Sequence, residues 1–112
     1  MCLGSGKIKR EFIYCDDVTK YLEKIIDNYT DFMNPINLGS GKDHYIFEVA
    51  NTIKKLTGFQ GEIVWDTSKP DGQKRKLLDV TKINNLLGPL EFIPLNEGLQ
   101  KTIEWFNEKY EI

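Results

Sequence analysis

The sequence contains few of the side chains from which metal and catalytic sites are most often built. One histidine, His44, and two cysteines, Cys2 and Cys15, occur among 112 residues. Two isolated thiols and one imidazole supply neither a structural zinc site nor the disulfide framework of a small secreted domain. We therefore expect no metal site, two free thiols in a reducing compartment, and no catalytic set within this chain.

A strong charge of one sign and a long apolar run are also missing. The net charge is −2, so no general field attracts nucleic acid or anionic lipid. Uncharged apolar stretches such as residues 86–90 and 92–95 are far shorter than the roughly 20 residues of a membrane span. The first residues have no apolar signal core. We expect a cytoplasmic protein without a membrane or nucleic-acid partner.

A complete dinucleotide-binding loop is absent as well. Such a loop needs the spacing GxGxxG between a strand and a helix, because its glycines let the backbone approach the pyrophosphate. Residues 4–6 and 39–41 contain only the first part of this spacing, and simple turns explain both. The chain alone is therefore not expected to bind a dinucleotide cofactor.

Hydrophobic periodicity predicts short strands mixed with three to four helices. Strands are expected at residues 9–14, 36–38 and 62–65. Apolar residues at three- and four-residue spacing predict helices at residues 16–29, 43–57, 81–86 and 95–110. This pattern indicates an α/β (α+β-like) fold in one domain, residues 1–112, that can bury a modest core.

The starts of two helices carry further expectations. Asp43 is expected to cap the second helix and Thr81 the third, since both side chains can accept a hydrogen bond from a free backbone N–H. His44 would then lie in the first turn of the second helix, at the surface. No sequence feature gives it the partner that a general base needs.

A basic loop at residues 69–76 is the first candidate binding segment. It carries Lys69, Lys74, Arg75 and Lys76 around one acid, Asp71. Cationic side chains pair with phosphate oxygens, and an ionised aspartate can accept two O–H bonds from a vicinal diol. Phosphate together with a diol describes a nucleotide. A solvated charged loop without a ligand remains the alternative.

A second candidate segment surrounds Arg10. This residue stands at the edge of an expected strand and close to the glycine loop at residues 4–6. Backbone N–H groups of such a loop and a guanidinium can face the same anion. A surface arginine beside a simple turn is the alternative.

Together, these segments resemble one family. The stretch from Leu3 to Asp17, LGSGKIKREFIYCDD, resembles the pattern WG(S/T)GxxxREF(I/L)(H/Y)(V/C)DD of GDP-L-fucose synthases. Residues 36–41, INLGSG, are similar to IN(V/I)G(T/S)G, and residues 102–106 to the closing TxxWF. The most specific match is residues 61–80, GEIVWDTSKPDGQKRKLLDV, to Gx(I/V)V(W/F)DxSKPDGxxRKLLDV. The resemblance covers almost the whole chain in the right order.

This resemblance implies the C-terminal, substrate-binding domain of an extended short-chain dehydrogenase, with the Rossmann domain absent. The family is an NADP-dependent epimerase and reductase acting on GDP-4-keto-6-deoxy-mannose. Arg10 matches its substrate-binding arginine, which we assign to the diphosphate, and Asp71 its substrate-binding aspartate, which we assign to the ribose diol. Leu3 stands where the family has a substrate-contacting tryptophan. Arg75 and Lys76 match the RK pair of the loop.

The family's cofactor loop, catalytic serine, Tyr-x-x-x-Lys pair and acid/base Cys and His precede the matched segment. Cys2, Cys15 and His44 do not match those catalytic positions. The resemblance therefore implies GDP-sugar binding without turnover by this chain alone, with NADP bound elsewhere in the full-length family. The alternative is a non-catalytic interaction module that pairs with a Rossmann-domain chain or self-associates through an uncovered apolar face.

Overall fold

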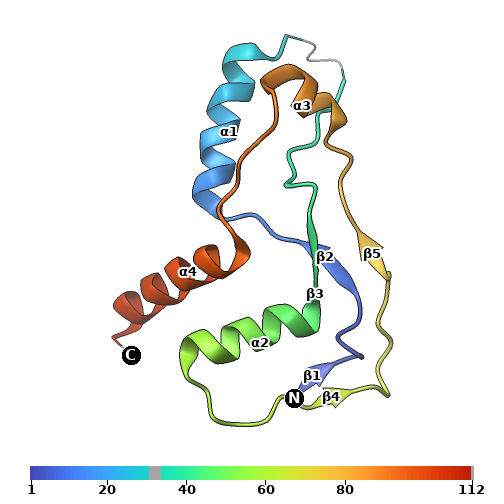
Figure 1. Ribbon diagram of the computed structural model, residues 1–112, viewed down its shortest axis with the longest axis vertical. Helices are drawn as coiled ribbons and strands as arrows, with labels where there is room; N and C mark the ends of the chain where they lie inside the picture. The colour runs from blue at the N-terminus through green and yellow to red at the C-terminus, as the bar shows by residue number, and fades with distance from the viewer. Residues whose placement is uncertain (31–33, 112) are drawn as a thin grey trace.

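The computed structural model describes residues 1–30 and 34–111 (Figure 1). Four helices and five short strands alternate in it, which confirms the predicted mixed α/β fold. In chain order the elements are β1 (Cys2–Leu3), β2 (Lys9–Glu11), α1 (Cys15–Asn28), β3 (Asp43–Tyr45), α2 (Ile46–Thr57), β4 (Trp65–Asp66), β5 (Arg75–Lys76), α3 (Thr81–Leu87) and α4 (Leu95–Tyr110).

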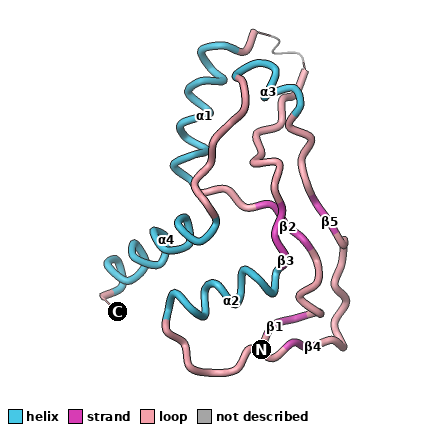
Figure 2. Tube along the Cα trace, in the orientation of Figure 1, coloured by secondary structure: helices cyan, strands magenta, loops and turns pink. Residues whose placement is uncertain are grey.

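The strands form two small sheets (Figure 2). The larger sheet has the order β3-β2-β5, with β2 antiparallel to β3 and parallel to β5. Arg10 of β2 lies between His44 of β3 and Lys76 of β5. The smaller sheet joins β1 and β4 in parallel. Strand β2 therefore brings three segments together that are far apart in the sequence.

The helices contact each other in two pairs, α1 with α3 and α2 with α4 (Figure 1). Tyr21 of α1 is 3% exposed, and its ring packs against Phe92 with the ring centroids 5.0 Å apart. Its hydroxyl donates to the Glu91 carbonyl at 2.6 Å and accepts the Glu91 N–H at 2.7 Å. Asp17 accepts the N–H of Ile93 at 2.9 Å. Helix α1 thus anchors the chain that leads into α4.

The predicted start of the second helix is wrong. Asp43 and His44 belong to β3, and α2 begins only at Ile46. The Glu48 carboxylate accepts the N–H of Tyr45 at 3.0 Å and so closes the first turn of the helix. The Asp43 carboxylate instead binds Arg75 of β5. A partner 32 residues away therefore replaces the local cap that the sequence suggested.

Other expected bounds also change. Residues 36–38 form no strand, and Asn37 contacts the Asp79 carbonyl through its side-chain amide, at 3.1 Å, instead of through its backbone. The strand expected at residues 62–65 is limited to β4, and the loop at residues 69–76 contains β5. Thr81 does not cap α3 but is its first residue, and its N–H donates to Asp79.

The buried apolar core of the described residues is small. Among the large apolar side chains that the structure describes, only Tyr21, Val49 and Ile83 are buried. The radius of gyration is 16.9 Å, whereas a compact domain of this length has about 13 Å. Many large apolar side chains are exposed instead: Met1, Leu3, Phe12, Leu22, Ile26, Ile53, Phe59, Val64, Leu77, Leu78, Leu86, Trp105, Phe106 and Tyr110. The molecule is therefore elongated and presents uncovered apolar surface.

No helix within the described ranges combines the length and the apolar character needed to cross a membrane.

Candidate anion-binding site

The two segments predicted to bind a ligand lie side by side. Strand β5 pairs with β2, and the Lys9 N–H donates to the Lys74 carbonyl at 2.9 Å. On one side of this pairing Asp71 contacts the glycine loop, and Gln73 contacts Arg10. The loop at residues 69–76 therefore runs along the segment from Ser5 to Arg10, as a shared ligand site requires.

The Asp71 carboxylate is bound to the glycine loop. Its Oδ1 accepts the N–H of Ser5 at 2.6 Å, and its Oδ2 accepts the Ser5 hydroxyl at 2.7 Å. The two hydrogen bonds from Ser5, helped by the charge of Lys7, hold the pKa of Asp71 below its usual value. A side chain at Gly4 would place its Cβ 2.6 Å from Oδ1, so this approach needs a glycine. Asp71 is thus an ionised anchor for the loop at residues 4–6.

Arg10 is half-buried and held by backbone oxygens. Its Nη1 donates to the Lys9 carbonyl at 2.7 Å and to the Gln73 carbonyl at 2.9 Å. Its other guanidinium N–H groups have no partner among the described residues. Arg10 lines a cavity of about 640 Å³ together with Arg75 and Lys76. The structure therefore gathers three of the predicted site residues, together with the acid Glu11, around one cavity in which basic side chains outnumber acidic ones.

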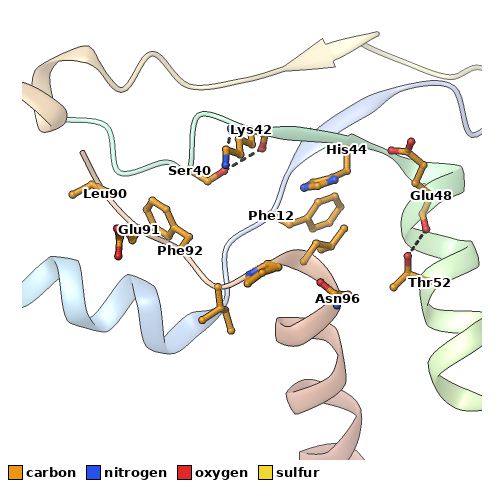
Figure 3. Close-up of a pocket in the computed structure, with 13 residues that line it drawn as sticks. Phe12, Ser40, Lys42, His44, Glu48, Thr52, Leu90, Glu91, Phe92 and Asn96 are labelled. Carbon is orange, nitrogen blue, oxygen red and sulfur yellow. Dashed lines mark hydrogen bonds between the residues drawn. The ribbon is translucent and has the colours of Figure 1, made fainter. Parts of the chain in front are cut away.

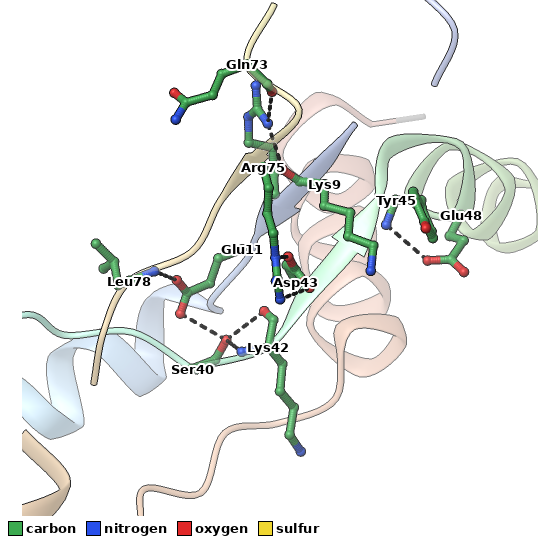
Figure 4. Close-up of polar contacts among 11 residues, drawn as sticks. Lys9, Glu11, Ser40, Lys42, Asp43, Tyr45, Glu48, Gln73, Arg75 and Leu78 are labelled. Atoms are coloured by element: carbon green, nitrogen blue, oxygen red, sulfur yellow. Dashed lines mark hydrogen bonds and ion pairs between the residues drawn. The ribbon is translucent and has the colours of Figure 1, made fainter. Parts of the chain in front are cut away.

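Arg75 is tied to Asp43 by an ion pair (Figure 4). Arg75 Nε donates to Asp43 Oδ2, and Nη2 lies 3.4 Å from Oδ1. The hydrogen bond and charge of Arg75 lower the pKa of Asp43, and Asp43 raises the pKa of Arg75 further. Lys76, by contrast, is exposed and has no polar side-chain partner in the part of the chain that the structure describes.

Glu11 is a structural member of the site that sequence reasoning missed. Its carboxylate accepts the Ser40 hydroxyl at 3.1 Å and the Leu78 N–H at 3.2 Å (Figure 4). It also accepts the Gly41 N–H at 3.0 Å. It therefore joins β2 to the loop at residues 39–41 and to the chain after β5. The resemblance contained the residue within its REF motif, but no local pattern indicated these distant contacts.

Leu3 lies apart from the basic cavity. It belongs to β1, pairs with Asp66 of β4, and is 67% exposed. It is not among the residues that line the cavity around Arg10. The structure therefore brings Arg10, Arg75 and Lys76 together. Asp71 belongs to the same loop, residues 69–76, as Arg75 and Lys76. Leu3 precedes the glycine loop at residues 4–6 and does not line the cavity.

His44 lines a second, wider cavity of about 900 Å³ (Figure 3). Phe12, Leu90 and residues 92–95 form its apolar wall, and polar or charged side chains also line it: Ser40, Lys42, Glu48 and Glu91. Glu48 is already bound to the N–H of Tyr45. The described residues contain no group of three or more side chains that could hold a metal ion.

Comparison with known proteins identifies the family. No family model matches the chain. The probable GDP-L-fucose synthase 1 of Oryza sativa subsp. japonica is 42% identical over 105 residues, which are 94% of this chain and 31% of the rice protein. The GDP-L-fucose synthase of Escherichia coli is 42% identical over 113 residues, covering 94% of this chain and 35% of that protein. Over 94% of its own length, this chain matches the GDP-L-fucose synthase family.

A solved structure supports the same relationship. The GDP-L-fucose synthetase of Naegleria fowleri, solved bound to NADP, superposes with a TM-score of 0.90 at 36% identity. The superposition covers 97% of this chain and 34% of that one. The predicted resemblance and fold are confirmed. The chain spans about a third of the length of these GDP-L-fucose synthases, and NADP is a ligand of the longer relative.

Proposed function

We propose that this chain is the GDP-sugar-binding part of an NADP-dependent epimerase/reductase of the GDP-L-fucose synthase type. The observation that carries the proposal is the cavity lined by Arg10, Arg75 and Lys76, whose loop at residues 69–76 also carries the anchored carboxylate of Asp71. Arg10 and Lys76 can form an anion site there, because guanidinium and ammonium groups both pair with phosphate oxygens, whereas Arg75 is already paired with Asp43. A diphosphate matches this charge better than a neutral sugar does.

Asp71 would make the site selective for a nucleotide over inorganic phosphate. A carboxylate has about four acceptor positions, and Ser5 occupies two of them. The remaining lone pairs can accept the two hydroxyls of a ribose. An aspartate is ionised at neutral pH, and the hydrogen bonds from Ser5 lower the pKa of Asp71 further. Asp71 therefore has two roles in the proposal, anchoring the glycine loop and accepting the diol.

We do not assign turnover to this chain alone. NADP supplies the hydride in the reduction, and the chain has no GxGxxG loop to bind it. Arg10, Lys76 and Asp71 would bind and orient the sugar nucleotide. The remaining two thirds of the relatives' length would supply the cofactor site and the catalytic side chains.

Replacing Arg10 or Asp71 with alanine is expected to weaken GDP binding by about 10- to 100-fold, since each variant removes hydrogen bonds to a charged group. The measurement is an amide chemical-shift titration of the purified chain with GDP and with GDP-mannose. Saturable shifts should cluster around Arg10 and residues 69–76. Lys55→Ala, which removes a cation from the exposed face of α2, is the matched control and should bind as the unchanged chain does.

A flat response of the unchanged chain at millimolar GDP would refute the proposed binding. Equal weakening by Lys55→Ala would also count against it, since a general loss of positive charge would then explain the effect.

The uncovered apolar surface favours a second candidate function, a non-catalytic module that pairs with a separate cofactor-binding chain. Leu22 and Ile26 on α1 and Trp105 and Phe106 on α4 are between 46% and 75% exposed. Apolar surface of this extent usually meets a partner. This candidate, unlike the first, predicts that the chain alone self-associates, so that sedimentation velocity would give a sedimentation coefficient that rises with concentration. A monomer that persists over the whole concentration range would argue against this candidate.

A further inference from the structure

Strand β5 is held at the edge of its sheet in spite of unfavourable charges. It contains only Arg75 and Lys76, and both are exposed. In the parallel register Lys9 lies opposite Arg75, and Arg10 lies opposite Lys76. Two cross-strand pairs of like charge destabilise a strand pairing, and neither residue of β5 supplies apolar packing to offset this. The contacts that hold β5 against β2 therefore come from the backbone pairing, from the flanking residues Gln73 and Leu78, and from the Arg75 side chain.

The Asp43–Arg75 ion pair is the contact among these that a side chain of β5 itself makes. Asp43 belongs to β3, on the opposite side of β2 from β5, so the Arg75 side chain reaches across the middle strand (Figure 4). The Asp43 side chain is only 7% exposed, whereas that of Arg75 is 59% exposed. Nε and Nη2 of Arg75 address the two carboxylate oxygens in a forked arrangement. The pair therefore braces the two outer strands of the sheet against each other.

The other cations of this strand pair differ in how they are held. The Lys9 ammonium lies over the Tyr45 ring, 4.5 Å from its centroid. Arg10 is fixed by two backbone carbonyls. Among the described residues Lys76 has no polar partner for its ammonium, so its position depends on where β5 lies.

We propose that Asp43 is a positioning residue of the anion site, which holds Arg75 and thereby keeps Lys76 of β5 beside Arg10. This inference rests on the proposed GDP binding. It assigns Asp43 no contact with the ligand, and it gives Arg75 a structural role in place of a direct phosphate contact.

The direction in which one substitution changes the GDP affinity distinguishes this proposal from a simple effect of charge. Asp43→Asn removes a negative charge beside a basic cavity, so charge alone predicts that GDP binds more tightly. A positioning role predicts the opposite, a loss of affinity of about tenfold, because β5 and Lys76 are no longer held. Glu97→Gln, which removes an equal charge on α4 from an exposed pair with Lys101, is the control and should leave the affinity unchanged.

A double-mutant cycle tests whether Asp43 affects GDP binding through Arg75. GDP affinity is measured by calorimetry for Asp43→Asn, Arg75→Gln and the combined variant. If Asp43 acts through Arg75, Asp43→Asn has no further effect once Arg75 is replaced. Arg75→Lys, which keeps the charge but loses the fork, should weaken GDP binding to a smaller extent. This milder variant also serves as the test if Asp43→Asn does not fold.

A measurement without ligand separates failure of this inference from failure of the proposed function. Hydrogen exchange of the Lys9 amide, which donates to the Lys74 carbonyl, should become faster in Asp43→Asn, while amides of α1 stay protected. Unchanged exchange at Lys9, or tighter GDP binding, would overturn the positioning role. If the unchanged chain binds no GDP, the proposed function fails, and the exchange rates alone decide whether Asp43 holds β5.

Discussion

Ile83→Ala is expected to lower the free energy of unfolding by about 2–5 kcal/mol, a large part of the stability of a small domain. Ile83 lies in α3, is fully buried at 0% exposure, and α3 packs against α1. Only two other large apolar side chains of the described residues, Tyr21 and Val49, are buried. A core this small has few neighbours that can move into the cavity left by the removed carbons.

The measurement is urea unfolding followed by circular dichroism, with Ile26→Ala as the matched control. Ile26 lies on α1 and is 75% exposed, so the same change of side chain removes little buried surface. We expect the urea midpoint of Ile26→Ala to stay close to that of the unchanged chain. Equal destabilisation by both substitutions would mean that Ile26 is covered in solution, as self-association would cause.

Local patterns predicted most of the fold because the helices carry their own signals. The apolar spacing around Tyr21 and Leu22 defines α1, and Gly58, with φ at 68°, ends α2 as expected for a C-terminal glycine. The strands were harder to predict, since each described strand contains only two or three residues. Strand β5 consists of Arg75 and Lys76, two cations with no strand-like alternation, and only its partner β2 makes it a strand.

The sequence predicted those residues of the candidate site that belong to recognisable motifs. Arg10 and Asp71 were predicted from the glycine loop, the basic loop and the family resemblance, and the structure brings their two segments side by side. The roles of Glu11 and Asp43 were not predictable. Their partners lie about 30 to 67 residues away, and no spacing in the sequence encodes such pairs. Local cap preference instead placed Asp43 wrongly at a helix start.

Gly6→Ala is expected to lower the free energy of unfolding by about 2–5 kcal/mol, through backbone strain and through overpacking, and to weaken GDP binding as well. The residue has φ of +73°, which costs a side chain roughly 1–2 kcal/mol. An added Cβ would also lie 2.9 Å from two atoms of the Trp65 ring, and such overpacking costs about 1–3 kcal/mol. Because Ser5 is the neighbouring residue, a shift of Gly6 would also move Ser5 away from the Asp71 carboxylate.

Gly72→Ala measures the contribution of backbone strain at positive φ without the contact with Trp65. Gly72 has nearly the same φ, +72°, but an added Cβ would meet nothing within 4 Å. The difference in unfolding free energy between the two variants therefore measures the contact with Trp65 alone. We expect Gly6→Ala to be the less stable variant and to bind GDP more weakly, with amide shifts at Ser5 that Gly72→Ala lacks. Equal stability of the two variants would mean that the Trp65 ring moves aside, and the loop at residues 4–6 would then not be held by its packing against Trp65.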